Sequence, residues 1–420
     1  MRAALGALIA ILLTAAPAVA QTPYVATPLL EPGAGVCPGG LCQAEALTGV
    51  FEALAATEAG TLDRPVHILQ IGDSHTAGDR ITGKLRIDLQ SRFGRSGRGV
   101  MPPGVPWDGY APYQVTVAQR GWLMETAPLA PPNGSMFQRM GVSGVRAVGL
   151  RDAVMGFEPE PGSEATAFGV CGRSSVDGGG VRIEAGGVGL EVGLGDGVTE
   201  VCRTLTFPAP VSSVRVMPAG EGAVIDSVWL GGAARGVTVS NLGRVGGTLR
   251  DLAAREEGIV SAELAAWRPD LIVIAFGTND GFDDGLDAGA YETLLRGQIA
   301  RMRRLAPGAS LMILGAPDAL RGGATNGCSA DGTRAPPPKL AVVRDVQRRV
   351  AADLGVAFWD WHGRMGGDCS ADRLALRAEP LMRGDRVHFT SAGADWIGGV
   401  LSGDLMGAYD RWKADRGGAE

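Results

Sequence analysis

Residues 66–76 read Val66-His67-Ile68-Leu69-Gln70-Ile71-Gly72-Asp73-Ser74-His75-Thr76. The first six are mostly apolar and lead into a glycine, a pattern typical of a buried strand that runs into a turn. The stretch from about Gly78 to Phe93 then carries apolar residues four positions apart, which predicts a helix. In α/β sheets, ligands bind beyond the carboxyl ends of the strands. The polar residues of this turn, Ser74 among them, are therefore the first candidates for a functional site.

Strands and helices alternate again after about residue 240. The apolar run at 271–276 is typical of a strand that is buried on both faces. We expect a helix over about 290–305, a strand at 311–314, a helix over about 338–353 and a strand at 356–359. Alternation at this spacing predicts a parallel sheet with right-handed crossovers, which is an α/β fold.

The segment between these two parts has a different texture. Short valine-rich stretches alternate with Gly, Pro and Ser, and turn signals recur about every ten residues. This pattern predicts antiparallel β structure of sandwich or barrel type. We therefore expect an α/β domain in two pieces, 46–104 and 241–415, with an inserted β-rich domain at 105–240.

The first residues predict export from the cytoplasm. Arg2 is followed by an apolar run, and the small residues Ala18-Val19-Ala20 precede Gln21. We expect a cleaved signal peptide at 1–20, with an uncleaved membrane anchor as the alternative. Residues 21–45 are rich in Pro and Gly and are expected to form a loosely held leader. Nothing later in the chain reads as a membrane span.

The cysteines and the charge also bear on the compartment and the partners. Six cysteines fit disulfides in an oxidising compartment better than a metal site, because no Cys-x-x-Cys or matched histidine spacing occurs. The formal net charge is -6 and no basic stripe is present, so nucleic acid is not expected as a partner. Other disulfide connectivities stay open. Bonding between nearest neighbours would give the pairs Cys37–Cys42, Cys171–Cys202 and Cys328–Cys369.

Two further polar clusters follow predicted strands or precede the last helix. One is Gly277-Thr278-Asn279-Asp280, and the other is Asp385-Arg386-Val387-His388-Phe389-Thr390. A serine hydroxyl is a weak nucleophile that needs an adjacent base. His388 can supply the base, and Asp385 can hold its ring in the reactive tautomer. Because a spacing of three lets one turn present both groups, the residues predict a catalytic triad of Ser74, His388 and Asp385.

The order and content of these clusters resemble the SGNH (GDSL-type) hydrolase superfamily. Its first, third and fifth blocks match the clusters that contain Ser74, Asn279 and His388. The second block needs a glycine, for which Gly246 is the candidate and Gly144 the rival. The resemblance implies a three-layer α/β/α sandwich with a parallel sheet. It also implies a carboxylic ester hydrolase that uses no cofactor and no metal.

The resemblance also implies roles for single residues. An oxyanion hole would consist of the backbone N–H groups of Ser74 and Gly246 and the side-chain amide of Asn279. His75 follows the nucleophile, where it could contact the substrate or pack beside the turn. His362 is expected to have a structural role.

A finer resemblance is to bacterial peptidoglycan O-acetylesterases. It is carried by His75 after the serine, by Thr82-Gly83-Lys84-Leu85, and by the last block, in which Arg386 replaces the family's glycine. Those enzymes carry a β-sandwich like a carbohydrate-binding module between the first and second blocks. The resemblance implies a periplasmic or secreted enzyme. Through an acyl-enzyme on Ser74, it would remove the acetyl group from the C6 hydroxyl of N-acetylmuramic acid in peptidoglycan.

Two other functions stay open. The same triad could serve an esterase or acetyltransferase that acts on another acetylated polysaccharide, because a triad does not show whether water or a sugar hydroxyl accepts the acyl group. The second alternative is a non-catalytic carbohydrate-binding protein. Trp107, Trp122 and Trp229 could stack on sugar rings or belong to the core. The sequence predicts no oligomeric state.

Overall fold

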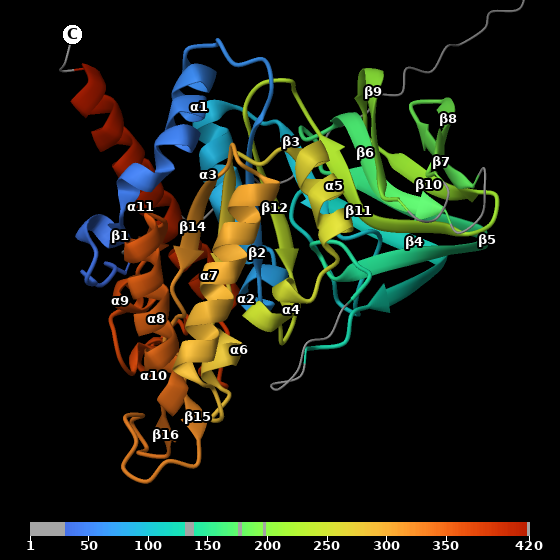
Figure 1. Ribbon diagram of the computed structural model, residues 1–420. Helices are drawn as coiled ribbons and strands as arrows, with labels where there is room; N and C mark the ends of the chain where they lie inside the picture. The colour runs from blue at the N-terminus through green and yellow to red at the C-terminus, as the bar shows by residue number, and fades with distance from the viewer. Residues whose placement is uncertain (1–29, 131–137, 175–178, 196–198, 418–420) are drawn as a thin grey trace, which may run out of the picture. The chain divides into compact units, whose positions relative to one another are not determined.

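A computed structural model describes residues 30–130, 138–174, 179–195 and 199–417. The expected signal peptide at 1–20 and the first part of the expected leader lie outside these residues. Residues Pro32–Glu420 belong to one compact unit, which contains a parallel sheet with its helices and a separate antiparallel sheet (Figure 1). No helix in the described ranges is long and apolar enough to cross a membrane.

The parallel sheet forms the centre of the α/β part. Its strand order is β1-β17-β14-β13-β2-β12, and all neighbours are parallel except β1, which pairs antiparallel to β17 at one edge. Every residue of the five parallel strands is buried, as expected for strands covered on both faces. The strands are β1 (Leu41–Cys42), β2 (Val66–Gly72), β12 (Val237–Gly243), β13 (Leu271–Ala275), β14 (Ser310–Leu314) and β17 (Ala357–Trp359).

Helices cover both faces of this sheet. The connection from β2 to β12 runs one way along the sheet, whereas the connections from β12 through β13 and β14 to β17 run the other way. Right-handed crossovers therefore place their helices on opposite faces. One face carries α1 (Thr48–Glu58), α3 (Arg80–Phe93) and α11 (Ser391–Gly417). The other carries α4 (Leu249–Ala253), α5 (Glu257–Trp267), α7 (Ala288–Leu305) and α8 (Pro338–Leu354).

Short helices occupy the carboxyl ends of the parallel strands. They are α2 (Ser74–Ala77), α6 (Thr278–Gly281), α9 (Trp361–Met365) and α10 (Ser370–Ala375). The helices on two faces of a mainly parallel sheet agree with the expected three-layer α/β/α architecture.

The antiparallel sheet forms a β-rich region, which comprises β3 through β11. Along its main path the order is β8-β7-β10-β5-β11-β6-β9, while β4 pairs with β5 and β3 pairs with β11. It has an apolar core of its own. The strands are β3 (Gly97–Met101), β4 (Val115–Thr126), β5 (Val145–Pro159), β6 (Ala165–Ser174), β7 (Gly180–Ala185), β8 (Val188–Gly193), β9 (Val201–Val211), β10 (Val214–Ala219) and β11 (Ala223–Gly231).

The first strand of this sheet lies before the boundary expected at 105. Strand β3 pairs with β11 from Met101 back to Gly97. The glycines of β3 make it hard to predict as a strand from the sequence. Glycine is nevertheless needed at position 99, where φ is +81°, because a Cβ there would overlap the side chains of Ser240 and Thr238 in β12. Strand β3 therefore belongs to the antiparallel sheet and also packs against the parallel one.

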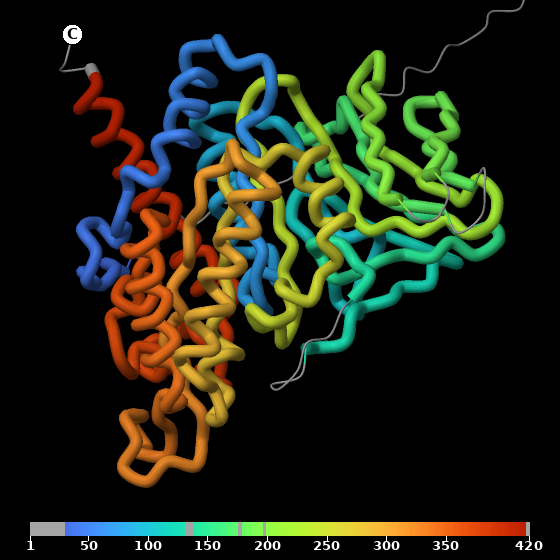
Figure 2. The backbone as a smooth tube through the Cα atoms, viewed as in Figure 1, coloured from blue at the N-terminus to red at the C-terminus, as the bar shows by residue number. Residues whose placement is uncertain are grey.

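The N-terminal segment is held more firmly than expected for a loose leader. A Cys37–Cys42 disulfide closes a small loop, and the side chains of Cys37 and Leu41 are buried. The N–H of Val36 donates to Oδ2 of Asp360 at 2.6 Å. Figure 2 shows the segment that follows running beside the C-terminal helix, as the contacts between α1 and α11 require. The pairs Cys171–Cys202 and Cys328–Cys369 are also present, so nearest neighbours are bonded throughout.

A buried carboxylate joins the two sheets. Asp79 accepts hydrogen bonds from Thr82 Oγ1 at 2.6 Å, Arg86 at 2.8 Å, Arg98 at 2.9 Å and the backbone N–H of Tyr113 at 2.8 Å. Burial alone would raise the pKa of Asp79, but the charges of Arg86 and Arg98 outweigh burial and keep the pKa below its ordinary value. The carboxylate thereby connects α3, β3 and the loop before β4.

A second buried ionic cluster lies where α5 meets the β-rich region. Glu263 accepts a hydrogen bond from the N–H of Val142 at 2.7 Å, and Arg173 donates to Glu200 at 3.1 Å and to Asp226. Burial raises the pKa of Glu263 to about 7, and the charge of Asp226 adds to this rise. Burial also raises the pKa of Glu200 to about 9. Burial thus makes carboxyl groups between α5 and the β-rich region favour their protonated form.

We predict that Asp79→Ala lowers the free energy of unfolding by about 3–5 kcal/mol, because it leaves two buried guanidinium groups without their carboxylate. Denaturant unfolding followed by tryptophan fluorescence measures the change. Asp88→Ala on the same helix is the control, since its ion pair with Lys84 is partly exposed and should contribute less than about 1 kcal/mol. Equal losses in the two variants would contradict a special role for Asp79.

We also predict that stability falls as the pH rises from about 5 to 8. The folded chain retains a proton on Glu263 that the unfolded chain, with an ordinary pKa of about 4.3, has lost. The stability that this proton contributes is fully present below the pKa that Glu263 has in the unfolded chain. It is lost as the pH rises through the pKa that Glu263 has in the folded chain. Glu263→Gln should make the fall smaller, and the raised pKa of Glu200 accounts for part of what remains. Glu257→Gln, at the exposed start of the same helix, should leave the fall unchanged. Unfolding midpoints at several pH values measure both, and equal slopes would rule out this origin.

Candidate active site

Ser74 lies at the tight turn between β2 and α2. Asp73 caps the helix by accepting the N–H of His75 at 2.9 Å, and its own N–H donates to the carbonyl of Ala275 in β13. A Cβ on Gly72 would approach Thr76 Oγ1 and the Ala275 carbonyl within 2.6 Å, so only glycine fits there. The Gly-Asp-Ser sequence thus fixes the serine at the end of a buried strand.

The structure brings Ser74, His388 and Asp385 together. Nε2 of His388 lies 2.9 Å from Oγ of Ser74, and Nδ1 lies 2.8 Å from Oδ2 of Asp385. The other Asp385 oxygen accepts the backbone N–H groups of Val387 at 2.9 Å and His388 at 3.0 Å. Serine, imidazole and carboxylate therefore form one continuous chain of hydrogen bonds across 314 residues of sequence.

The carboxylate also determines which imidazole nitrogen carries the proton. Burial would raise the pKa of Asp385, but hydrogen bonds from the N–H groups of His388 and Val387 and from the His388 ring outweigh it and lower the pKa. An ionised carboxylate only accepts hydrogen bonds, so Nδ1 must donate to it. The neutral ring then presents Nε2 to Ser74 as an acceptor, which is the tautomer that a general base needs.

The loop that carries the triad histidine is anchored at Arg386. Its φ is +58°, a left-handed conformation that favours glycine. The guanidinium Nε donates to Asp372 at 2.9 Å, and the carbonyl accepts the N–H of Leu320 at 3.0 Å. This ion pair explains how arginine occupies a position at which the resembled family has glycine.

His75 occupies one of its two expected placements, beside the turn. Its ring is buried, with Nδ1 at 3.1 Å from Asp73 Oδ1 and Nε2 at 2.9 Å from the carbonyl of Val387. Burial would lower the pKa of His75, but the charge of Asp73 and the hydrogen bonds to it outweigh burial and raise the pKa. Both partners are acceptors, so His75 uses both nitrogens to connect the nucleophile turn to the triad loop.

Gly246 and Asn279 follow the two strands that flank β2. Strands β12 and β13 are paired with β2 up to its last residue, so both loops emerge at the edge where Ser74 lies. Nδ2 of Asn279 donates to the Gly247 carbonyl at 2.9 Å, which leaves its second N–H for a ligand. Gly144 instead precedes β5 in the β-rich region, where its carbonyl accepts the N–H of Ala127.

A cavity of about 520 Å³ lies beside Ser74 and His388. The loop between β3 and β4 forms part of its wall with Trp107, Tyr110 and Tyr113. Of the three tryptophans considered for sugar contact, only Trp107 lines this cavity, whereas Trp122 and Trp229 are 5% and 9% exposed. The aromatic residues recur every third position in the sequence. This regular spacing is the signal in the sequence for the loop beside the cavity.

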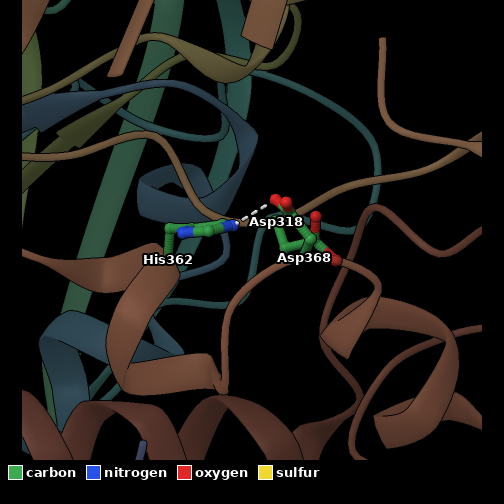
Figure 3. Close-up of side chains that lie close together, drawn as sticks. All are labelled: Asp318, His362 and Asp368. Atoms are coloured by element: carbon green, nitrogen blue, oxygen red, sulfur yellow. Dashed lines mark hydrogen bonds and ion pairs between the residues drawn. The ribbon is translucent and has the colours of Figure 1, made fainter. Parts of the chain in front are cut away.

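His362 belongs to a separate cluster. Figure 3 shows its ring directed at the carboxyl groups of Asp318 and Asp368. Nε2 lies 2.8 Å from Asp368 Oδ1, and Asp318 Oδ2 accepts the N–H of Ala371 at 2.9 Å. One ligand atom from each of the three side chains lies within 4.8 Å of the others, a spacing that could hold a metal ion. Triad residues are not part of the cluster.

Residues 227–396 match the GDSL-like Lipase/Acylhydrolase family. This segment, which is less than half of the chain, is similar to the GDSL-like acylhydrolases. It includes Asn279, Asp385 and His388, while Ser74 lies before the β-rich region, two residues after strand β2 ends. The chain is therefore a carboxylic ester hydrolase with an SGNH-type α/β domain.

One solved structure extends the likeness in fold beyond this segment. A peptidoglycan O-acetylesterase is 24% identical, with a TM-score of 0.74 over 88% of this chain and 99% of that one. The acetyl xylan esterase AlAXEase is 18% identical over 39% and 78% of the two chains, with a TM-score of 0.29. A family two carbohydrate esterase from Clostridium thermocellum is 12% identical over 73% and 98%, with a TM-score of 0.30. No curated protein sequence matches the chain.

We predict that Arg386→Gly is more stable than Arg386→Ala by about 1 kcal/mol. Both variants lose the ion pair with Asp372, but only alanine retains the strain of the left-handed backbone. Urea unfolding of the two variants gives the difference. Equal stability would show that the positive φ carries no cost in this loop.

Proposed function

We propose that the chain is a serine esterase that removes O-acetyl groups from glycan. The bond cleaved is the acetyl ester on the C6 hydroxyl of N-acetylmuramic acid in peptidoglycan. The hydrogen-bonded chain of Ser74, His388 and Asp385 is the observation that carries the catalytic part of this proposal. The fold shared with a solved peptidoglycan O-acetylesterase supports the choice of glycan.

In the proposed reaction each group has a role that its geometry supports. Nε2 of His388 removes the Ser74 proton while Oγ attacks the acetyl carbonyl carbon. Negative charge then develops on the carbonyl oxygen, for which the N–H groups of Ser74 and Gly246 and the Asn279 amide are the proposed donors. When the tetrahedral intermediate collapses, the ester C–O bond breaks and His388 returns the proton to the sugar oxygen. Water then attacks the acetyl carbon while His388 takes its proton. The bond between Ser74 Oγ and the acetyl carbon breaks, acetate leaves, and His388 returns the proton to Oγ.

Two points support a location outside the cytoplasm. Three disulfides join all six cysteines, which is consistent with an oxidising compartment outside the cytoplasm. The proposed substrate is also located there. We place the enzyme in the periplasm or outside the cell, with the signal peptide removed. We also propose that the segment 105–240 is a domain inserted into the hydrolase.

Acetate release from O-acetylated peptidoglycan tests the proposal. The wild-type chain should release acetate without an added acceptor, and Ser74→Ala should reduce the rate to background. His388→Ala should cost about as much, since triad residues act as a unit. The proposal is wrong about the nucleophile if Ser74→Ala retains activity on p-nitrophenyl acetate. It is wrong about the glycan if only another acetylated polymer, such as acetylated xylan, is hydrolysed.

Replacement of the proposed oxyanion donor should affect the rate more than substrate binding. We predict that Asn279→Ala lowers kcat by about 10²–10³-fold with a small change in KM, because the hydrogen bond strengthens only in the transition state. Kinetics on p-nitrophenyl acetate, with the unfolding midpoint as a control for folding, measure this. A change confined to KM would remove Asn279 from the oxyanion hole.

A further inference from the structure

The loop at 102–114, which we call the aromatic loop, forms part of the wall of the cavity that His388 also lines. Trp107, Tyr110 and Tyr113 line the cavity together with Ser74 and His388. A Cβ added to Gly109, which also lines the cavity, would meet nothing within 4 Å. The space beside the loop is therefore open to a ligand that has its ester at Ser74.

The aromatic loop is held in place from several sides. The N–H of Tyr113 donates to Asp79 at 2.8 Å, and the N–H of Tyr110 donates to the carbonyl of Trp107 at 3.1 Å. The edge of one ring faces the other in the pair Trp107 and Tyr110, whose centroids are 5.1 Å apart. A Cβ on Gly83 of α3 would lie 3.0 Å from the Tyr113 ring, so this glycine lets the tyrosine pack against the helix. A fixed wall recognises a ligand without a large ordering cost.

The charges around the cavity are also uneven. Arg80 lies over the Tyr113 ring at 5.2 Å and is 3.7 Å from Asp395, so its charge is partly balanced. Arg383 lines the cavity, is exposed, and donates through Nε to the carbonyl of Phe389 at 3.1 Å. Among the described residues it forms no ion pair. Its guanidinium can therefore bind a carboxylate of the ligand.

We propose that the aromatic loop is the sugar-recognition site of this enzyme and that it selects an anionic glycan. Trp107 stacks on the apolar face of a pyranose ring, and Arg383 pairs with a carboxylate carried by the glycan or its attached peptide. The inference rests on the proposed function, because it names the parts of that substrate next to the acetyl ester. A rigid aromatic ring with a polar neighbour is the kind of surface that binds such amphipathic ligands.

The test measures the full-length protein on three substrates. They are p-nitrophenyl acetate, which has no sugar, acetylated xylan, which serves as the neutral glycan, and O-acetylated peptidoglycan. Trp107→Ala should lower kcat/KM on both glycans about tenfold more than on p-nitrophenyl acetate, mainly through KM. Trp107→Phe, which keeps a ring face, should recover much of this loss. An equal loss on all three substrates would overturn the role of Trp107 in sugar binding.

Arg383→Gln tests the charge. It should lower kcat/KM on peptidoglycan about tenfold more than on acetylated xylan and should reduce the sensitivity of the peptidoglycan reaction to salt. Arg377→Gln is the matched control, because Arg377 is exposed and does not line the cavity. Equal effects of Arg383→Gln on the two glycans would overturn the preference for an anionic ligand.

The proposed function fails if the wild-type chain releases no acetate from peptidoglycan, whatever the variants do. The aromatic-loop inference fails if the wild-type chain is active on glycans but Trp107→Ala and Arg383→Gln alter all substrates alike.

Discussion

Asp79 and the two arginines that pair with it are the constraint on which the site depends. The carboxylate lies five residues after Ser74, directly beyond the short helix that the serine begins. It binds Arg86 of α3, Arg98 of β3 and the N–H of Tyr113 at once. Because a buried guanidinium without its partner is costly, these three segments must adopt their relative positions together. The hydrolase sheet, the β-rich region and the aromatic loop are thereby set with respect to the nucleophile.

The opposite side of the site is held by a different set of contacts. The triad loop is connected to the nucleophile turn through His75 and the Val387 carbonyl, and to α10 through the ion pair of Arg386 with Asp372. Neither contact includes an atom of the reacting chain from Ser74 to Asp385. The imidazole is thus positioned from two directions while its Nε2 stays available to the serine. Such support by surrounding groups is what keeps a catalytic geometry rigid.

Local signals in the sequence predicted much of the fold and the site. The buried strands and the triad residues were predictable, because strand ends and polar clusters are properties of neighbouring residues. Contacts between distant segments were not. Nothing near Arg98 indicates that it pairs with Asp79, and the glycine-rich β3 does not resemble a strand. The N-terminal segment read as loose because its partner, β17, lies more than 300 residues later. Gly246 and Gly144 could be told apart only by the strand pairing that places one of them beside β2.

The interruption between β2 and β12 has a consequence for how the enzyme becomes active. These two strands are neighbours in the sheet, yet the whole β-rich region is made between them, and His388 follows Ser74 by 314 residues. Pairings of such long range form late, since the loop-closure entropy must be paid before the contacts stabilise the chain. A chain still emerging from the ribosome has Ser74 but lacks His388, its proposed base. In the proposed mechanism, ester cleavage therefore begins only when nearly the entire polypeptide has been made and folded.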